Sequence, residues 1–178
     1  MKLKNLSAVA LKSERFGNVI SPETVEARLG FTVPEVLRDI LVEYPGPVGF
    51  DLKIGIEAKH FPAIESNNLI ELEILFGFND GADGLVTMRE AYRDRVQEVF
   101  VPVADAGAGD LFFWNIDSDQ IFFWHHESPN GESSPEAMTL IADTLESFIN
   151  SLVVFPDEDR EIPLPNVPDD AFDFLLDK

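Results

Sequence analysis

Two adjacent histidines followed by a glutamate, His125-His126-Glu127, are the side chains best suited to acid–base chemistry or metal binding. The third histidine of the chain, His60, is remote from them in sequence. The preceding residues, 121–124, are typical of a β-strand, and adjacent strand residues point to opposite faces of a sheet. We therefore expect that His125 and His126 do not share a metal ion. No residue at a diagnostic spacing completes a site around them.

A glycine-rich segment, Asp105-Ala106-Gly107-Ala108-Gly109-Asp110, is the second feature that could do chemistry. A glycine-rich loop binds phosphate when it leads into the N-terminus of a helix. Here the segment lies between two predicted strands, and the aspartate at each end would repel an anion. We expect a turn whose glycines adopt positive φ angles.

The 33 acidic residues make chance carboxylate pairs inevitable, so such pairs do not identify a glycosidase-type site. The sequence contains no Gly-x-Ser-x-Gly, no P-loop and no His-Glu-x-x-His motif. It also has no cysteine, which excludes disulfides, thiolate ligands and a cysteine nucleophile. We predict no catalytic residue, no metal and no cofactor. An enzyme that uses His125, His126 and nearby carboxylates is the least favoured alternative.

Hydrophobic periodicity and capping signals predict the elements that position these residues. Helices are expected at residues 22–29, 34–44 and 135–153, and a shorter one runs from a capping box at Thr87–Glu90 to about residue 95. Strands are expected at residues 50–56, 69–78, 99–103, 111–116 and 121–125. The fold class is therefore α+β, with an N-terminal helical pair, a mostly antiparallel sheet and a C-terminal helix that packs on it.

The last two predicted strands form a hairpin that is apolar at consecutive positions, Leu111-Phe112-Phe113-Trp114 and Ile121-Phe122-Phe123-Trp124. A strand exposed on one face would alternate apolar and polar residues. Both faces of this hairpin should therefore be largely covered, and we expect Trp114 and Trp124 to be mostly buried.

The acidic charge is concentrated in the second half of the chain, which has 178 residues and a net charge of −20. Residues 1–95 carry 11 basic and 15 acidic side chains, whereas residues 96–178 carry 2 basic and 18 acidic ones. No lysine or arginine occurs between Val96 and Asp159. Such a surface repels phosphates and anionic lipids, so we expect neither nucleic acid nor membrane binding. The charge either keeps the chain in solution or docks a basic partner.

The character of the chain changes at Pro156, the first of four prolines that alternate with acidic residues. We expect a domain over residues 15–155 and an acidic, proline-rich tail over residues 156–178. Residues 1–20 contain neither a continuous apolar run nor a cleavage pattern for secretion, so the expected location is the cytoplasm.

Five motifs in the same order resemble the signatures of the SUKH superfamily, which includes Smi/Knr-like regulators of cell-wall assembly and bacterial immunity proteins. They lie at residues 29–34 (Leu-Gly-Phe-Thr-Val-Pro), 37–44, 102–110, 121–127 and 142–152. Two turn residues depart from the pattern: Pro45 replaces an asparagine, and Ala108 replaces the middle glycine of a triplet. The resemblance implies an α+β fold and a protein-binding function without catalytic residues.

The leading hypothesis from this resemblance is an immunity protein that neutralises a toxin, for example a nuclease, by stoichiometric binding. A regulatory scaffold for an endogenous protein or peptide is the alternative. If the acidic half docks a basic partner, loop carboxylates are the best contacts because they are free to meet it. The predicted partner-binding residues are Asp105, Asp117, Asp119, Glu127 and Glu132.

Overall fold

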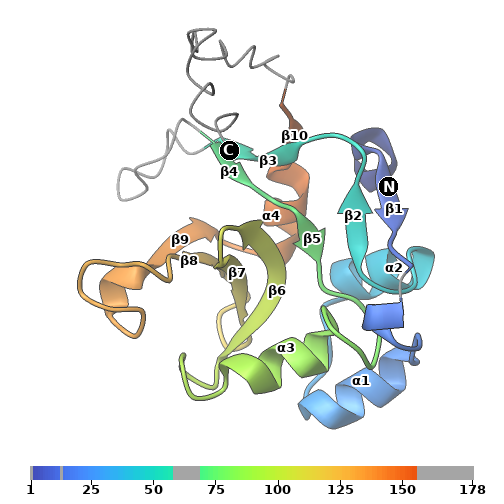
Figure 1. Cartoon of the computed structure of the whole chain (residues 1–178), viewed down its shortest axis with the longest axis horizontal. Coiled ribbons are helices and arrows are strands. Elements are labelled where there is room, and N and C mark those ends of the chain that lie inside the picture. The colour runs from blue at the N-terminus through green and yellow to red at the C-terminus, as the bar shows by residue number, and fades with distance from the viewer. Residues whose placement is uncertain (1, 13, 58–68, 156–178) are drawn as a thin grey trace, which may run out of the picture.

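The structure, a computed structural model, describes residues 2–12, 14–57 and 69–155 (Figure 1). Its α-helices are α1 (Pro22–Leu29), α2 (Glu35–Glu43), α3 (Leu85–Tyr92) and α4 (Leu145–Ser151). Short 3-10 helices are η1 (Lys2–Leu6), η2 (Glu14–Phe16) and η4 (Pro135–Ala137). Within these ranges no helix has the length and apolar character needed to cross a membrane. The expected tail, residues 156–178, lies outside the described residues.

Seven strands form an antiparallel sheet in the order β1-β2-β5-β6-β7-β8-β9. They are β1 (Ala8–Ala10), β2 (Val48–Phe50), β5 (Ile74–Leu75), β6 (Phe100–Gly107), β7 (Asp110–Asn115), β8 (Ile121–Trp124) and β9 (Met138–Ala142). A smaller antiparallel sheet has the order β10-β3-β4, with β10 (Val153–Val154), β3 (Ile54–Glu57) and β4 (Leu69–Glu71). The predicted α+β class with a mostly antiparallel sheet is confirmed. Figure 1 shows α1 and α3 at one end of the molecule and the smaller sheet at the other.

The predicted N-terminal helical pair is confirmed, and its signals act as expected. The Ser21 side chain accepts a hydrogen bond from the Thr24 N–H and caps α1, which ends at Gly30 with a φ of +83°. Glu26 of α1 accepts a hydrogen bond from the Val33 N–H and pairs with Arg38 of α2. These contacts join the two helices across their short connector.

The aromatic hairpin β7–β8 is covered on both faces, as predicted. On one face Phe112 packs against Phe148 of α4, with ring centroids 5.0 Å apart. On the other face Tyr92 of α3 packs edge-on against Trp124 at 5.6 Å. Trp124 is fully buried and Trp114 is 6% exposed. Both faces of the hairpin are therefore occupied by side chains of the protein's own helices.

The helix predicted over residues 135–153 is wrong. This segment forms η4, then strand β9 and only then α4, whose N-cap is Thr144. Helical spacing of apolar residues spans the whole segment, but β9 pairs with β8 and so satisfies backbone groups that would otherwise form an open sheet edge. Tertiary pairing overrides the local pattern here. The part that remains helical does pack on the sheet, through Phe148.

Two predicted strands are each divided between the two sheets. Residues 50–56 contain the end of β2 in the large sheet and most of β3 in the small one, and residues 69–78 contain β4 and β5. Period-two alternation reports which side chains are buried, not the sheet to which a strand belongs. Gly55 permits the close approach of β3 to β4, because a Cβ there would lie 2.0 Å from the Ile70 carbonyl oxygen.

The short helix predicted from Thr87 begins earlier and ends sooner. Helix α3 starts at Leu85 with Gly84 as its N-cap and ends at Tyr92, so Thr87 is not its cap. An isolated β-bridge between Gly77 and Gly84 holds the backbone just before Leu85, where the helix begins. The three arginines in and after this helix have different partners. Arg89 donates to the Leu29 carbonyl oxygen, Arg93 pairs with Glu90, and Arg95 pairs with Glu132.

Candidate functional site

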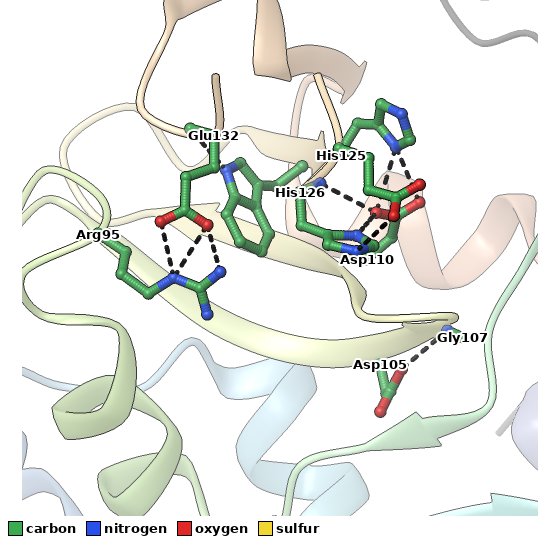
Figure 2. Close-up of polar contacts among 9 residues, drawn as sticks. Arg95, Asp105, Gly107, Asp110, His125, His126 and Glu132 are labelled. Carbon is green, nitrogen blue, oxygen red and sulfur yellow. Dashed lines mark hydrogen bonds and ion pairs between the residues drawn. The ribbon is translucent and has the colours of Figure 1, made fainter. Parts of the chain in front are cut away.

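The turn between β6 and β7 lies at one end of the aromatic hairpin. Its residues Gly107, Ala108 and Gly109 have φ angles of +82°, +53° and +96°. The expected turn with positive φ at its glycines is confirmed, and the segment joins two strands rather than leading into a helix. The Asp105 carboxylate accepts a hydrogen bond of 2.7 Å from the Gly107 N–H and so fixes the entry to the turn (Figure 2).

Asp110, the first residue of β7, brings both histidines together. Its Oδ1 lies 2.7 Å from His126 Nδ1, and both of its carboxylate oxygens lie 3.2 Å from His125 Nδ1 (Figure 2). One ligand atom from each of the three residues lies within 4.8 Å of the others. Both histidine side chains therefore meet one carboxylate, and the premise that they point to opposite faces of the sheet is wrong.

The local backbone explains this convergence. Strand β8 ends at Trp124, so the alternation of side chains between the two faces of a sheet no longer holds for His125 and His126. The His126 N–H also donates to Asp110 Oδ1 at 3.0 Å, which orients the carboxylate. Gly109 leaves space for the His126 ring, because a Cβ there would lie 3.1 Å from its Cε1.

Glu132, one of the predicted partner-binding acids, forms an ion pair with Arg95. Both of its carboxylate oxygens contact Arg95 Nε at 3.1 Å, and its backbone oxygen accepts a 2.7 Å hydrogen bond from Trp124 Nε1. The Arg95 guanidinium also lies over the Trp124 ring, 4.9 Å from its centroid. The hydrogen bonds from Arg95 lower the pKa of Glu132, and those to Glu132 raise the pKa of Arg95. Figure 2 shows this pair beside the hairpin.

The other four predicted acids occupy two ends of the same hairpin. Asp105 and Glu127 lie at the end that holds the β6–β7 turn and the histidines, whereas Asp117 and Asp119 lie in the opposite turn between β7 and β8. Asp119 accepts a 2.9 Å hydrogen bond from Trp114 Nε1. Asp117 and Glu127 are exposed. The sequence-based set thus spans the hairpin rather than one cluster.

Two acidic residues near this end were missed from the sequence. Asp110 faces the histidines because Leu111 pairs with Trp124, a register that places the first residue of β7 beside the residue that follows β8. Glu73 lies beside the β6–β7 turn, since a Cβ on Gly107 would be 2.6 Å from its Oε1. Partial burial raises the pKa of Glu73, and the charges of Asp105 and Glu71 act in the same direction. The hairpin register could have identified Asp110 from the sequence, whereas Glu73 carries no such signal.

Comparison with known proteins identifies the family to which these elements belong. A model of the SMI1 / KNR4 family (SUKH-1) matches residues 22–151, from the first residue of α1 to the last residue of α4. The chain belongs to the SUKH-1 family. It is also 32% identical to the SPbeta prophage-derived uncharacterized protein YokK of Bacillus subtilis (strain 168) over 148 residues, 77% of this chain and 76% of that protein. No solved structure matches the chain.

The SUKH-1 match contains the complete hairpin and its two ends. The glycine-rich turn, Asp110 and both histidines therefore belong to the family domain. Strand β1 precedes the matched residues, yet it pairs with β2 and extends the large sheet. The large sheet thus includes a strand that lies before the residues of the family match.

Proposed function

We propose that this SUKH-1 chain is a non-catalytic protein-binding domain, an immunity protein that neutralises a bacterial toxin by stoichiometric binding. Family membership supports a protein-binding role in immunity or regulation. The similar protein from Bacillus subtilis is described as derived from a prophage, a setting consistent with a gene carried for conflict between bacteria or their elements.

The observation that carries the proposal is the composition of the surface around β6 to β9. These strands and their loops lie entirely within the span from Val96 to Asp159, which has no lysine or arginine. Complementary fields accelerate association with a basic partner and disfavour acidic ones. A nuclease toxin needs a basic surface to hold phosphates, so an acidic inhibitor is well suited to cover it.

Co-expression tests this function. The toxin domain encoded in the same locus is induced in a bacterial host with and without this chain, and growth is followed. We expect growth to be restored, and the purified pair to elute as an equimolar complex. Loss of toxicity at strongly substoichiometric amounts of the chain would contradict the proposal, because it indicates turnover. No protection and no complex would favour regulation of an endogenous protein.

The non-catalytic part of the proposal makes a prediction about the histidines. His125→Ala and His126→Ala should each leave neutralisation nearly intact, because we propose that inhibition rests on surface contact and not on proton transfer. The same co-expression assay measures this, with circular dichroism to verify the fold of each variant. Loss of protection by a folded variant would instead indicate a chemical role for the pair.

A further inference from the structure

Asp110, His125 and His126 form a cluster with the composition of a metal site, and the proposed toxin binding makes no use of it. Two imidazoles and one carboxylate are a common ligand set for zinc and neighbouring divalent transition metals. We propose that this cluster binds one divalent transition metal ion, with Zn²⁺ as the representative, through the Asp110 carboxylate and Nδ1 of both histidines.

The spacing of the three ligand atoms fits such an ion. Metal–ligand distances of about 2.0–2.2 Å in tetrahedral geometry place ligand atoms about 3.3–3.6 Å apart. The Asp110 oxygens lie 2.7 Å from His126 Nδ1 and 3.2 Å from His125 Nδ1. All three ligand atoms lie within 4.8 Å of one another. Small rotations of the side chains are therefore sufficient to admit the ion, and the backbone need not move.

Groups around the ligands hold them in a suitable state. The His126 N–H donates to Asp110 Oδ1 at 3.0 Å, which fixes the carboxylate before an ion binds. On the other side of the His126 ring, Nε2 lies 3.7 Å from Glu127 Oε1. This distance is too long for a hydrogen bond, so Glu127 acts there as a nearby negative charge that favours a bound cation.

Charge and access also favour a cation. Strands β6 to β9 and their loops contain no lysine or arginine, and Asp105 and Glu127 add negative charge at this end of the hairpin. The side chains of His125, His126 and Asp110 are 47%, 29% and 16% exposed, so an ion can reach all three. Three protein ligands leave a coordination position for water or for a donor atom from a partner.

The alternative is a purely hydrogen-bonded cluster, in which both imidazoles donate their Nδ1 protons to Asp110. Isothermal titration of tag-free, chelator-treated protein with ZnCl₂ separates the two. We expect saturable binding of one ion per chain, loss of that binding in His125→Ala and His126→Ala, and at least tenfold weaker binding in Asp110→Asn. Glu127→Gln should weaken binding less than Asp110→Asn does, because Glu127 lies 3.7 Å from the ring and contributes charge without a hydrogen bond.

Two variants serve as matched controls. Asp117→Asn removes the same group from the opposite end of the hairpin, and His60→Ala removes the third histidine of the chain; both should bind Zn²⁺ like wild type. Zn²⁺ should also raise the melting temperature of wild type and controls but not of the ligand variants.

Three results would overturn the site. Wild-type protein without saturable binding leaves only the hydrogen-bonded cluster. Unchanged affinity for Zn²⁺ in Asp110→Asn or in His125→Ala means that the three residues do not bind one ion together. Equal loss in His60→Ala assigns the ion to another place. None of these results bears on toxin neutralisation, which is measured separately.

Discussion

Ala108 shows how one residue records a departure from a family pattern. It occupies the middle of the β6–β7 turn with a φ of +53°, between Gly107 and Gly109 at +82° and +96°. Residues with a Cβ avoid this region because of a clash with the backbone, whereas glycine enters it freely. The positive φ angles of this turn explain why the SUKH motif that residues 102–110 resemble has three glycines here. Ala108 adopts the same backbone conformation in spite of its Cβ.

Substitutions at Ala108 and Gly109 should affect stability differently. Ala108→Gly should leave the free energy of unfolding unchanged or raise it by up to about 1 kcal/mol, because relief of strain offsets the greater freedom of the unfolded chain. Gly109→Ala should lower it by at least about 1 kcal/mol, since the new Cβ meets the His126 ring. Urea denaturation measures both. A clear loss of stability in Ala108→Gly would contradict the interpretation.

Glu132 is held in its loop by two contacts, because Arg95 pairs with its carboxylate and Trp124 Nε1 donates to its backbone oxygen. The pKa of Glu132 is lowered in the folded chain, so its contribution to stability is present above the unfolded pKa and is lost as the pH falls through the folded pKa. Glu132→Gln should therefore lower the melting temperature at neutral pH, and the difference from wild type should vanish at acidic pH.

The exposed Glu136→Gln is the control for this prediction, since it removes an equal charge. Thermal melts at several pH values compare the three proteins. A pH-independent difference, or an equal one in both variants, would show that the ion pair with Arg95 does not stabilise the fold.

Elements with strong local signals were predictable from the sequence, and elements set by distant pairing were not. Ser21, Pro22 and Gly30 define α1 by capping, and the aromatic runs define the β7–β8 hairpin. Strand β9 had no such signal, because its apolar spacing also fits a helix and only pairing with β8 decides the matter. The meeting of Asp110 with the histidines was missed although the hairpin was predicted, because it depends on the exact register of the two strands.

Capping distinguishes the observed α4 from the long helix that the sequence indicated. Thr144 accepts a 3.0 Å hydrogen bond from the Ser147 N–H, whereas the buried Ser134 hydroxyl has no partner among the described residues. Thr144→Ala should lower the free energy of unfolding by about 0.5–2 kcal/mol, and Ser134→Ala should leave it nearly unchanged. Chemical denaturation compares them. A larger loss of stability in Ser134→Ala than in Thr144→Ala would instead support a helix that begins after Ser134.

The division of charge along the chain becomes a division of surfaces in the folded molecule. The acidic residues of 96–155 lie on β6 to β9, α4 and their loops, and the basic residues lie mostly on the earlier elements. Beside this region, partial burial raises the pKa of Glu73, and the charges of Asp105 and Glu71 act in the same direction. An acidic surface without lysine or arginine is consistent with a partner of opposite charge.

Association kinetics with the toxin domain encoded in the same locus give the sharpest test of acidic docking. Asp117 and Glu127 are the exposed members of the predicted set, and reversing both to lysine should slow association at low salt by at least about tenfold. The effect should shrink at high salt because the charges are screened. The control, Asp39→Lys with Asp94→Lys, makes the same change in net charge on the earlier elements and should associate nearly like wild type. Equal rates and equal salt dependence for the wild type and the Asp117 and Glu127 double variant would contradict docking through the acidic half.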